Sequence, residues 1–496
     1  MPVTLAERGR SVESAPMTTE VGAPTVPIYL AGEFVEAGTP LEVRNPATDE
    51  LVATTWQAGP DELERATAAA VTAFEQTRRL ASFERRDALQ HVADSITRDA
   101  DDLAELLTRE SGKPIRDARG EVARGALTFR TAAEEALRIN GEWVPLDWTA
   151  ANRGRSGIVR RYPIGPVAGI SPFNFPLNLA AHKVAPAIAA GCSIVLKPPS
   201  KDPLVMLRVA EYLHQTDLPP GAVSILPMDR PTGDRMVADD RFKLLTFTGS
   251  PSVGWKMKTD AGRKKVVLEL GGNAGVIVDE TADLDWAVAR LVFGAFAYAG
   301  QVCISVQRIY VVESIYPEFE RRFVDKVRQV KMGDPMDPAS DLGPMVNAGA
   351  VARTDEWVRE ALDDGARALT GAKSDGLFYE PTVLVDVPRD ARVCGEEVFA
   401  PVVNLFPVPD FAAALREIND SRFGLQCGLF TGSLEHTLAA HDELEVGGII
   451  VNDVPTWRTD PMPYGGVKDS GLGREGLRWS IEDMTEPRLL AFARPL

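Results

Sequence analysis

A cysteine in the second half of the chain stands where a thiol could act as a nucleophile. The apolar segment 283–299 is predicted to be a buried helix, and it delivers Cys303 to an interior position at a turn that contains Gly300. Most buried free cysteines are simply small hydrophobic residues, so a packing role is the alternative. The other chemistry-bearing residues decide between the two.

The cysteines are few and widely separated. No C-x-x-C pair occurs and almost no histidine lies near them in the sequence, so neither a disulfide framework nor a zinc site is indicated. They are Cys192, Cys303, Cys394 and Cys427. A reducing compartment such as the cytoplasm fits this pattern and leaves Cys303 available as a thiolate.

A carboxylate is the second candidate group. Glu269 follows the apolar run 266–268 and precedes Gly271 and Gly272. Burial at the end of an apolar strand raises the pKa of a carboxyl group and prepares it to act as a general base. A buried carboxylate with a structural role is the alternative.

The elements that must position these groups alternate between strand and helix. Short apolar runs separated by helical segments predict an α/β fold with a parallel sheet covered on both faces. The runs are 167–170, 193–196, 223–226, 244–247 and 266–268, with helices expected at 179–190 and 204–213. Ligands of such sheets bind beyond the carboxyl ends of the strands.

Polar residues gather at those carboxyl ends. Asn174 follows the first run, Lys197 the second, and Gly249 and Ser250 the fourth. Ser250 suits a helix N-cap before Pro251, and a helix N-terminus after a glycine can hold a pyrophosphate. For any one of these residues an ordinary helix cap is the alternative.

The remaining segments are predicted to be scaffold. A hairpin is expected at 28–34, and three amphipathic helices at 61 onward, 83–111 and 115–139. A second alternating region has strands at 308–312, 382–385 and 448–451 and helices at 317–330, 351–363 and 411–419. The strand-like tail 488–493 favours pairing with another subunit. The sequence G-L-G-R-E-G at 471–476 matches a dinucleotide motif, but no predicted strand precedes it, so we exclude it from the cofactor site.

Charge and hydropathy exclude two classes of partner. The chain has 54 basic and 71 acidic residues and a net charge of −17, which argues against nucleic acid and anionic membrane surfaces. It has no apolar run long enough to span a bilayer. Residues 1–27 resemble a loosely attached tail more than a signal peptide, which favours a cytoplasmic protein.

Six ordered motifs resemble those of the aldehyde dehydrogenase superfamily. They are S-P-F-N-F-P at 171–176, K-P-P-S at 197–200, F-T-G-S at 247–250, L-E-L-G-G-N at 268–273, G-Q-V-C at 300–303 and E-E-V-F-A-P at 396–401. The likeness runs from Tyr29 to Ala493, and Ala400 is the one visible departure, at a position where glycine is usual. The resemblance implies a Rossmann-like cofactor domain (28–141 and 162–270), an α/β catalytic domain (271–473) and a small β oligomerisation arm (142–161 and 474–496).

The resemblance also implies roles for the candidate groups. Cys303 would attack the aldehyde carbon, the Asn174 amide and the Cys303 backbone N–H would hold the oxyanion, and Glu269 would activate the water that hydrolyses the thioester. The residues implied to bind the cofactor are Ser171, Pro172, Phe173, Lys197, Ser200, Gly233, Gly249, Ser250, Leu270, Glu397 and Phe399.

The cofactor is expected to be NADP or NAD. Relatives committed to NAD usually have a glutamate three residues after the lysine, and here that position is Ser200, followed by Lys201. A neutral residue removes repulsion toward a 2′-phosphate and Lys201 adds attraction, so NADP is predicted to be accepted. A turn before Pro203 is the alternative role of Ser200.

The substrate is expected to be a small polar or anionic aldehyde. Alignment through the motifs places Arg124, Asn178, His182, Arg458 and Tyr464 along the substrate tunnel, and arginine suits a carboxylate, phosphate, phosphonate or sulfonate. The pattern resembles the lactaldehyde, phosphonoacetaldehyde and non-phosphorylating glyceraldehyde-3-phosphate branch. Val302 stands where the two phosphate-type members usually have arginine, which favours a lactaldehyde-like or semialdehyde substrate.

Three other functions are alternatives to an aldehyde dehydrogenase that hydrolyses its thioester. A CoA-acylating dehydrogenase would not need the Glu269 base, and a non-catalytic structural relative would not need the thiol, amide and carboxylate together. A cysteine hydrolase would need a histidine beside the thiol, and only His182 is placed for it. The enzyme is expected to be a homodimer or homotetramer with a small-molecule aldehyde as its partner and with no metal.

Overall fold

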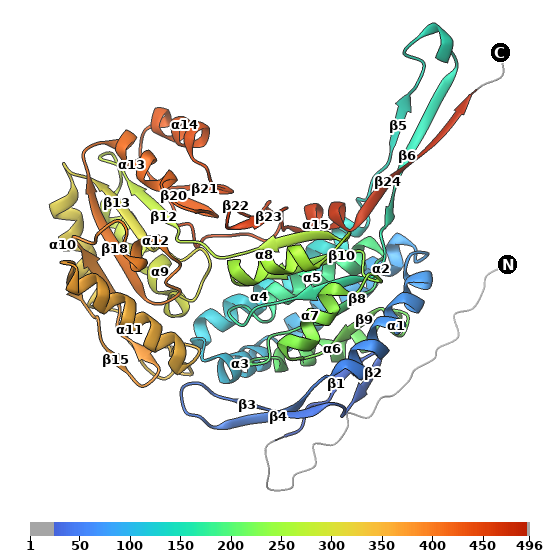
Figure 1. Cartoon of the computed structure of the whole chain (residues 1–496), viewed down its shortest axis with the longest axis horizontal. Helices are drawn as coiled ribbons and strands as arrows, with labels where there is room; N and C mark the ends of the chain where they lie inside the picture. Colours follow the sequence, from blue (N-terminus) through green and yellow to red (C-terminus); the bar gives the residue numbers. More distant parts are fainter. Residues whose placement is uncertain (1–23, 494–496) are drawn as a thin grey trace.

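A computed structural model of the chain describes residues 24–493. Most of the predicted tail at 1–27 lies outside the described residues. Within them the chain forms two large sheets flanked by helices and a narrow projecting arm (Figure 1). The predicted α/β fold with parallel sheets is confirmed. No helix among the described residues has the length and apolarity that crossing a membrane requires.

The first large sheet has eight strands in the order β2-β1-β9-β8-β7-β10-β11-β23. Its five central strands are parallel and lie within two residues of the predicted runs: β9 (Val223–Ile225), β8 (Ile194–Lys197), β7 (Val167–Ile170), β10 (Leu244–Thr248) and β11 (Lys265–Glu269). The predicted hairpin, β1 (Ile28–Leu30) and β2 (Glu33–Val35), forms one edge, and β23 (Gly471–Leu472) pairs antiparallel with β11 at the other. Chain order reverses between β7 and β10, and in sheets of this kind the ligand crevice is expected beyond the carboxyl ends at such a point.

Helices cover both faces of this sheet. They are α1 (Pro60–Thr77), α2 (Ser82–Arg98), α3 (Ala100–Ser111), α4 (Ile115–Ala136), α5 (Asn178–Ala190), α6 (Leu204–His214), α7 (Arg230–Ala238), α8 (Pro251–Asp260) and α15 (Leu477–Asp483). Every residue of α5 is buried, as a helix packed on all sides must be. The prediction of one helix over 83–111 is wrong, because Asp99 leaves helical geometry (φ −101°, ψ 26°) where its carboxylate accepts from the Tyr212 hydroxyl at 2.7 Å.

The second large sheet has seven strands in the order β14-β17-β18-β13-β12-β20-β21. All of its pairs are parallel except β14 with β17. The strands are β12 (Gly275–Val278), β13 (Arg308–Val312), β14 (Arg367–Thr370), β17 (Thr382–Val385), β18 (Val402–Val408), β20 (Gln426–Phe430) and β21 (Gly448–Val451). The helices are α9 (Leu284–Phe296), α10 (Tyr316–Val327), α11 (Ala348–Asp363), α12 (Arg392–Gly395), α13 (Phe411–Asn419) and α14 (Leu434–Glu443).

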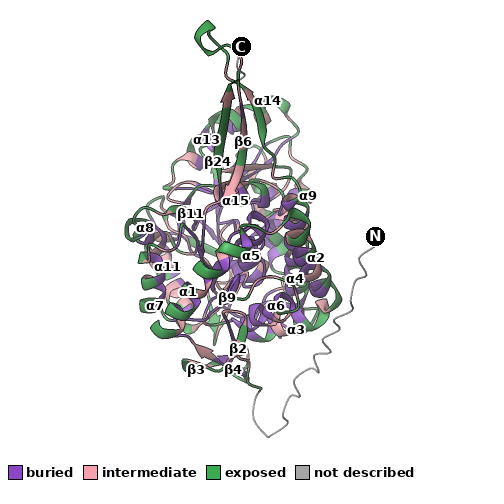
Figure 2. Cartoon of the chain, turned by 90° about the vertical axis from the view of Figure 1, so that its right-hand side faces the viewer, coloured by how far each residue is buried: buried purple, intermediate pink, exposed green. Residues whose placement is uncertain are grey.

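The arm is a three-stranded antiparallel sheet, β24-β6-β5, that projects from the body. Its strands are β5 (Glu142–Pro145), β6 (Arg155–Pro163) and β24 (Thr485–Ala493), so the predicted strand-like tail is confirmed. Most arm residues are exposed (Figure 2), in contrast to the buried strands of the body. Shorter elements complete the fold: β3 (Thr39–Arg44), β4 (Leu51–Gln57), β15 (Ser374–Asp375), β16 (Phe378–Tyr379), β19 (Phe423–Gly424), β22 (Val467–Lys468), and the 3₁₀ turns η1 (Ala150–Asn152) and η2 (Ala297–Gly300).

Candidate active site

The segment before Cys303 turns sharply out of α9. The helix ends at Phe296, earlier than predicted, because Tyr298 (φ 47°) and Ala299 (φ 55°) adopt left-handed backbone conformations. Such conformations cost free energy in non-glycine residues and concentrate at functional sites. Gly300 must be glycine, since a Cβ atom there would lie 2.2 Å from the carbonyl oxygen of Ala400. The kink therefore holds Cys303 on a strained, well-defined turn.

The thiol itself faces a tyrosine. Cys303 Sγ lies 3.0 Å from the hydroxyl of Tyr464, and Cys303 is partly accessible. Burial raises the pKa of the thiol to about 12, while the Tyr464 hydrogen bond and the charge of Arg458 oppose that rise. Burial also raises the pKa of Tyr464 well above its ordinary value, so its hydroxyl keeps its proton and can donate to a thiolate.

Asn174 lies against the same turn. Its side-chain amide donates to the Gln301 carbonyl oxygen at 3.0 Å, and the residue is buried. The predicted oxyanion donor is thus bonded to the loop that carries Cys303. An amide N–H pair beside a nucleophile can stabilise the charge that develops on a carbonyl oxygen.

Glu269 ends β11 as predicted and is almost fully buried, with 3% of its surface exposed. Within residues 24–493, neither carboxylate oxygen has a hydrogen-bond partner. Burial, and then the charge of Glu475, raise the pKa of Glu269 well above its usual range, against the pull of Arg458 and Lys183. A structural carboxylate would be bonded to its surroundings. An unpartnered carboxyl group with a raised pKa is instead suited to take a proton from water.

Several predicted cofactor residues lie at or just after the carboxyl ends of β8 and β10, where this crevice is expected. Lys197 ends β8 and packs on Gly233, where a Cβ atom would lie 3.3 Å from the lysine side chain. Burial lowers the pKa of Lys197. Ser250 is the N-cap of α8 with Pro251 in the first turn, and its side chain makes no capping bond. Ser200 Oγ donates to the Met228 carbonyl at 3.2 Å.

A second set of cofactor residues meets this crevice from the other sheet. Glu397 accepts from the backbone N–H of Gly272 at 3.0 Å, and a Cβ atom on Gly271 would clash with its carboxylate. The rings of Phe173 and Phe399 meet edge to face, 5.9 Å between centroids. Burial raises the pKa of Glu397 to about 7. The close approach that these glycines allow, and the open helix start at Ser250, fit a dinucleotide.

The predicted substrate residues form a buried charged cluster. Arg124 Nη2 pairs with Asp460 at 2.9 Å, and Asp460 also lies 2.8 Å from His182 Nε2 and accepts from the Asn178 amide at 3.2 Å. Burial tends to raise the pKa of Asp460, but the hydrogen bond from His182 and the charge of Arg124 outweigh it and set that pKa well below its usual range.

The cluster continues to the thiol through Arg458. His182 Nδ1 lies 3.1 Å from Glu475, Arg458 pairs with Glu475 at 3.4 Å, and the Arg458 guanidinium lies 3.8 Å from the centre of the Tyr464 ring. Each of the two arginines already faces a carboxylate, a pairing that the sequence did not indicate. His182 directs its two ring nitrogens to Asp460 and Glu475 rather than to Cys303, unlike the partner that a cysteine hydrolase requires.

Several residues of the site were missed from sequence. Lys113 and Glu121 are both fully buried and form an ion pair. Lys113 Nζ also donates to the Asn174 carbonyl at 2.7 Å. Glu121 accepts from the backbone N–H groups of residues 177 and 178. Lys113 also lies 4.6 Å from the centre of the Tyr298 ring, so the pair touches both catalytic segments.

Glu475 belongs to the G-L-G-R-E-G motif, which thus contributes to the charged cluster. Opposite charges so far apart in sequence gave no signal of pairing.

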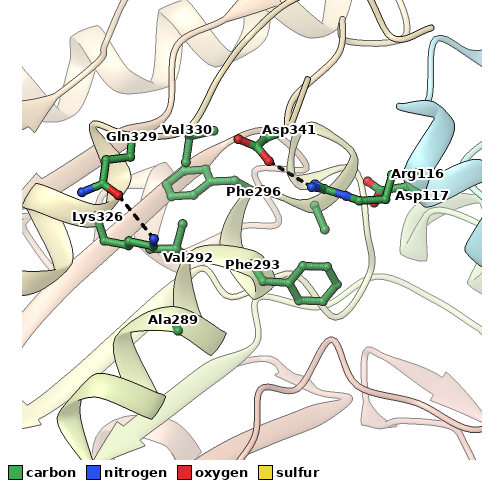
Figure 3. A pocket seen from close by; sticks show the side chains of 11 residues that line it. Arg116, Asp117, Ala289, Val292, Phe293, Phe296, Lys326, Gln329, Val330 and Asp341 are labelled. Carbon is green, nitrogen blue, oxygen red and sulfur yellow. Dashed lines mark hydrogen bonds and ion pairs between the residues drawn. The ribbon is translucent and has the colours of Figure 1, made fainter. Parts of the chain in front are cut away.

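A cavity of about 450 Å³ lies beside the last turns of α9, next to the segment that leads to Cys303 (Figure 3). Phe293 and Phe296 line it between the first turn of α4 and α10. Its polar groups are satisfied, with Arg116 bonded to Asp341 at 3.1 Å and Lys326 to Gln329 at 3.3 Å. Cys303, Asn174 and Glu269 do not line this cavity, so cavity size alone does not identify the active site.

Known proteins match the chain over nearly its whole length. A model of the aldehyde dehydrogenase family matches residues 34–490. A 3-sulfolactaldehyde dehydrogenase from Priestia aryabhattai is 42% identical, covering 93% of this chain and 97% of that protein. The structure of aldehyde dehydrogenase 21 from Physcomitrella patens, in complex with the reaction product succinate, is 47% identical with a TM-score of 0.94, covering 95% and 99% of the two chains. That of the glyceraldehyde-3-phosphate dehydrogenase GapN from Methanocaldococcus jannaschii, complexed with NADP, is 36% identical with a TM-score of 0.89, covering 93% and 100%.

Proposed function

The chain belongs to the aldehyde dehydrogenase family, and we propose that it oxidises a small anionic aldehyde to its carboxylic acid with NADP or NAD as hydride acceptor. The observation that carries the chemistry is that an amide and a carboxylate both act on Cys303, one through its loop and the other through its charge. Asn174 bonds the Cys303 loop, and the pKa of Glu269 responds to the charged cluster around that thiol. The CoA-acylating and non-catalytic alternatives are not favoured, because neither requires an unpartnered buried carboxylate.

The residues divide the reaction between them. Cys303 loses its proton to water and its sulfur bonds to the aldehyde carbon, while Asn174 Nδ2 and the Cys303 N–H stabilise the resulting oxyanion. A bound nicotinamide would supply the hydride acceptor, and loss of a hydride from that carbon would leave a thioester on Cys303. Glu269 takes a proton from water, the hydroxide attacks the thioester, and the acid leaves as the sulfur is released.

The cofactor would be held by the crevice residues. Lys197, Gly233 and Ser250 would hold the adenosine and phosphate side, and Glu397, Phe399 and Phe173 would hold the nicotinamide side; the packing of Lys197 on Gly233 and of Phe173 on Phe399 supports this. Ser200 places no negative charge three residues after Lys197, and Lys201 follows it. The absence of repulsion toward a 2′-phosphate favours NADP over NAD.

The substrate class follows from Arg458. This arginine is 4% exposed, stacks on the ring of Tyr464, and so lies one aromatic ring from the reacting sulfur. A short aldehyde with an anionic group at its other end would reach from Cys303 toward Arg458 and Arg124. The succinate bound in the moss relative and the sulfolactaldehyde named for the bacterial one both carry such an anion. We therefore place a four-carbon semialdehyde first.

A sulfonated three-carbon aldehyde is the second candidate. Arg124 keeps 30% of its side chain exposed, which leaves room for a second anion-binding contact. A phosphorylated substrate is less favoured because residue 302 is valine.

Steady-state kinetics test the proposal. Succinic semialdehyde, 3-sulfolactaldehyde, lactaldehyde and propanal are compared as substrates, each with NADP and with NAD. The anionic aldehydes are expected to have the highest kcat/KM. Equal values for propanal would contradict an anionic substrate, and strict preference for NAD would contradict the cofactor assignment.

The assembly and the compartment are part of the proposal. The arm exposes Trp143 and Trp148, and β24 exposes Leu489 and Leu490. These side chains and the unpaired strand edges support a homodimer or homotetramer that pairs through the arm. The four free cysteines are consistent with a cytoplasmic location.

A further inference from the structure

A polar cavity of about 390 Å³ lies at the base of the arm, away from Cys303. Its walls are the loop between α1 and α2, the first turn of α2, the last residue of α5, and residues 160–163 at the end of β6. In Figure 1 the arm strands meet the helical body at this junction. We call it the arm-base cavity.

Five arginines line the arm-base cavity, and no aspartate or glutamate does. They are Arg78, Arg79, Arg85, Arg160 and Arg161. This concentration of positive charge stands out in a chain whose net charge is −17. A concave surface lined by one sign of charge focuses the electrostatic field and concentrates ions of the opposite sign.

Two of these arginines are fixed by neutral acceptors, which leave their charge uncancelled. Arg85 donates to the Ala189 carbonyl at 2.5 Å and to Ser82 Oγ at 3.2 Å, and its buried Nε has no acceptor. Arg161 donates to Thr485 Oγ1 at 2.8 Å and to the Glu482 carbonyl at 2.6 Å. Guanidinium groups held in this way are preorganised for an oxyanion.

A third arginine stands opposite another positive charge. Arg160 of β6 pairs in register with Arg488 of β24, and both guanidinium groups lie over the Tyr162 ring, at 5.6 Å and 4.2 Å from its centroid. Like charges directly opposite each other on a sheet destabilise it. An anion between the arm and the body would relieve this repulsion.

The carboxylates near the cavity neutralise little of its charge, and Asp483, which interacts with Arg161, interacts more strongly with Lys265. Glu75 lies 3.5 Å from both Arg78 and Arg79, in exposed pairs of the kind that contribute little. Glu84 accepts from the backbone N–H of Ala81. The positive end of α2, a helix of 17 residues, adds to the arginine charge in the cavity.

We propose that the arm-base cavity binds a small polyanion whose carboxylate or phosphate groups are held by Arg85, Arg160 and Arg161. The volume accommodates a small organic molecule rather than a single ion. Because Arg161 belongs to β6 and Arg85 to α2, the bound anion joins the arm to the helical body. This site contains no nucleophile and acts as a structural or regulatory binding site.

Isothermal titration calorimetry on the full-length enzyme tests the proposal. Citrate and inorganic phosphate are titrated at constant ionic strength, with NADP at saturation so that the cofactor site is occupied. The variants are Arg160→Gln, which removes a charge that makes no hydrogen bond within the described chain, and Arg78→Gln. The matched control is Arg367→Gln, an exposed arginine of β14 paired with Asp386.

Citrate or phosphate is expected to bind the wild type. The dissociation constant should rise about tenfold in Arg160→Gln and stay unchanged in Arg367→Gln. Tighter citrate than phosphate would assign a polycarboxylate, and the reverse a phosphorylated ligand. No binding to the wild type, or equal binding by Arg160→Gln, would overturn the proposal. It would also be overturned if the anions had no effect while Arg160→Gln reduced the molecular mass of the assembly, because the arginines would then hold a neighbouring copy.

Discussion

The hydroxyl group of Tyr464 lies 3.0 Å from the sulfur of Cys303. Because the pKa of the buried thiol is raised to about 12, the free enzyme holds it protonated at neutral pH. Tyr464 and Arg458 lower the pKa of the thiol from the value that burial alone would give. The resting enzyme therefore has a protected thiol, and Tyr464 stabilises the thiolate when it forms.

The rate of alkylation by iodoacetamide measures how far the Tyr464 hydroxyl stabilises the Cys303 thiolate. Only the thiolate reacts, so the rate at Cys303 is expected to rise about tenfold per pH unit between pH 7 and 10, with no plateau in that range. Tyr464→Phe removes the donor and should slow the reaction about tenfold at each pH. An early plateau, or an unchanged rate in Tyr464→Phe, would show that the hydroxyl does not stabilise the thiolate.

The buried Lys113–Glu121 pair is expected to position Asn174. Lys113→Met leaves the Glu121 carboxylate buried without its cation, which should destabilise the protein by about 3–5 kcal/mol in urea unfolding. In the fraction that remains folded, kcat should fall more than KM changes, because the Asn174 backbone loses its anchor.

A double variant separates charge from position. Lys113→Met with Glu121→Leu removes both charges and should recover much of the lost stability, as apolar replacements of buried ion pairs often do. The lower kcat should persist, since the hydrogen bonds to residues 174, 177 and 178 are still missing. Full recovery of kcat would mean that the pair has no positioning role.

Arg124 is expected to contribute to substrate charge selection. Arg124→Met should reduce kcat/KM for succinic semialdehyde about tenfold or more and change that for propanal little. Arg116→Met, on the same helix but paired with Asp341 beside the other cavity, is the matched control. Equal losses for both aldehydes in Arg124→Met would identify Arg124 as only a structural partner of Asp460.

Ser200 is expected to govern the choice of cofactor. Ser200→Glu places a carboxylate three residues after Lys197 and should lower kcat/KM for NADP about tenfold or more by charge repulsion, with little change for NAD. Ser200→Gln, which has a similar size without the charge, should retain the NADP activity. If both variants behave alike, size and not charge controls the 2′-phosphate.

Burial explains why much of the fold could be predicted. Strands covered on both faces are continuous apolar runs, so the five central strands of the first sheet were found within two residues. The strands β12, β18 and β20 are equally buried but were overlooked among neighbouring apolar segments. The left-handed turn at Tyr298 and Ala299 had no sequence signal, because residues other than glycine rarely adopt it.

The positions of Cys303, Asn174 and Glu269 followed from local motifs, since each ends or follows a recognisable element. Their surroundings could not be derived in the same way. Arg124 and Asp460 are 336 residues apart in sequence, and Lys113 reaches Asn174 across 61 residues. Tertiary packing, such as that of α4 against α5, brings these charges together, and local sequence motifs do not report it.

Oxidation of the aldehyde is expected to leave an acyl group on Cys303, and Glu269 is expected to release it by activating water. Glu269→Gln removes the general base while keeping the shape of the side chain, and it should slow turnover by about 10²–10⁴-fold. Mixed with succinic semialdehyde and NADP, it should give one equivalent of NADPH per active site in a rapid burst and then stall. Intact-mass and peptide analysis of the stalled enzyme should find a succinyl group on Cys303. A burst without an adduct, or an adduct on Cys192, Cys394 or Cys427, would contradict the account.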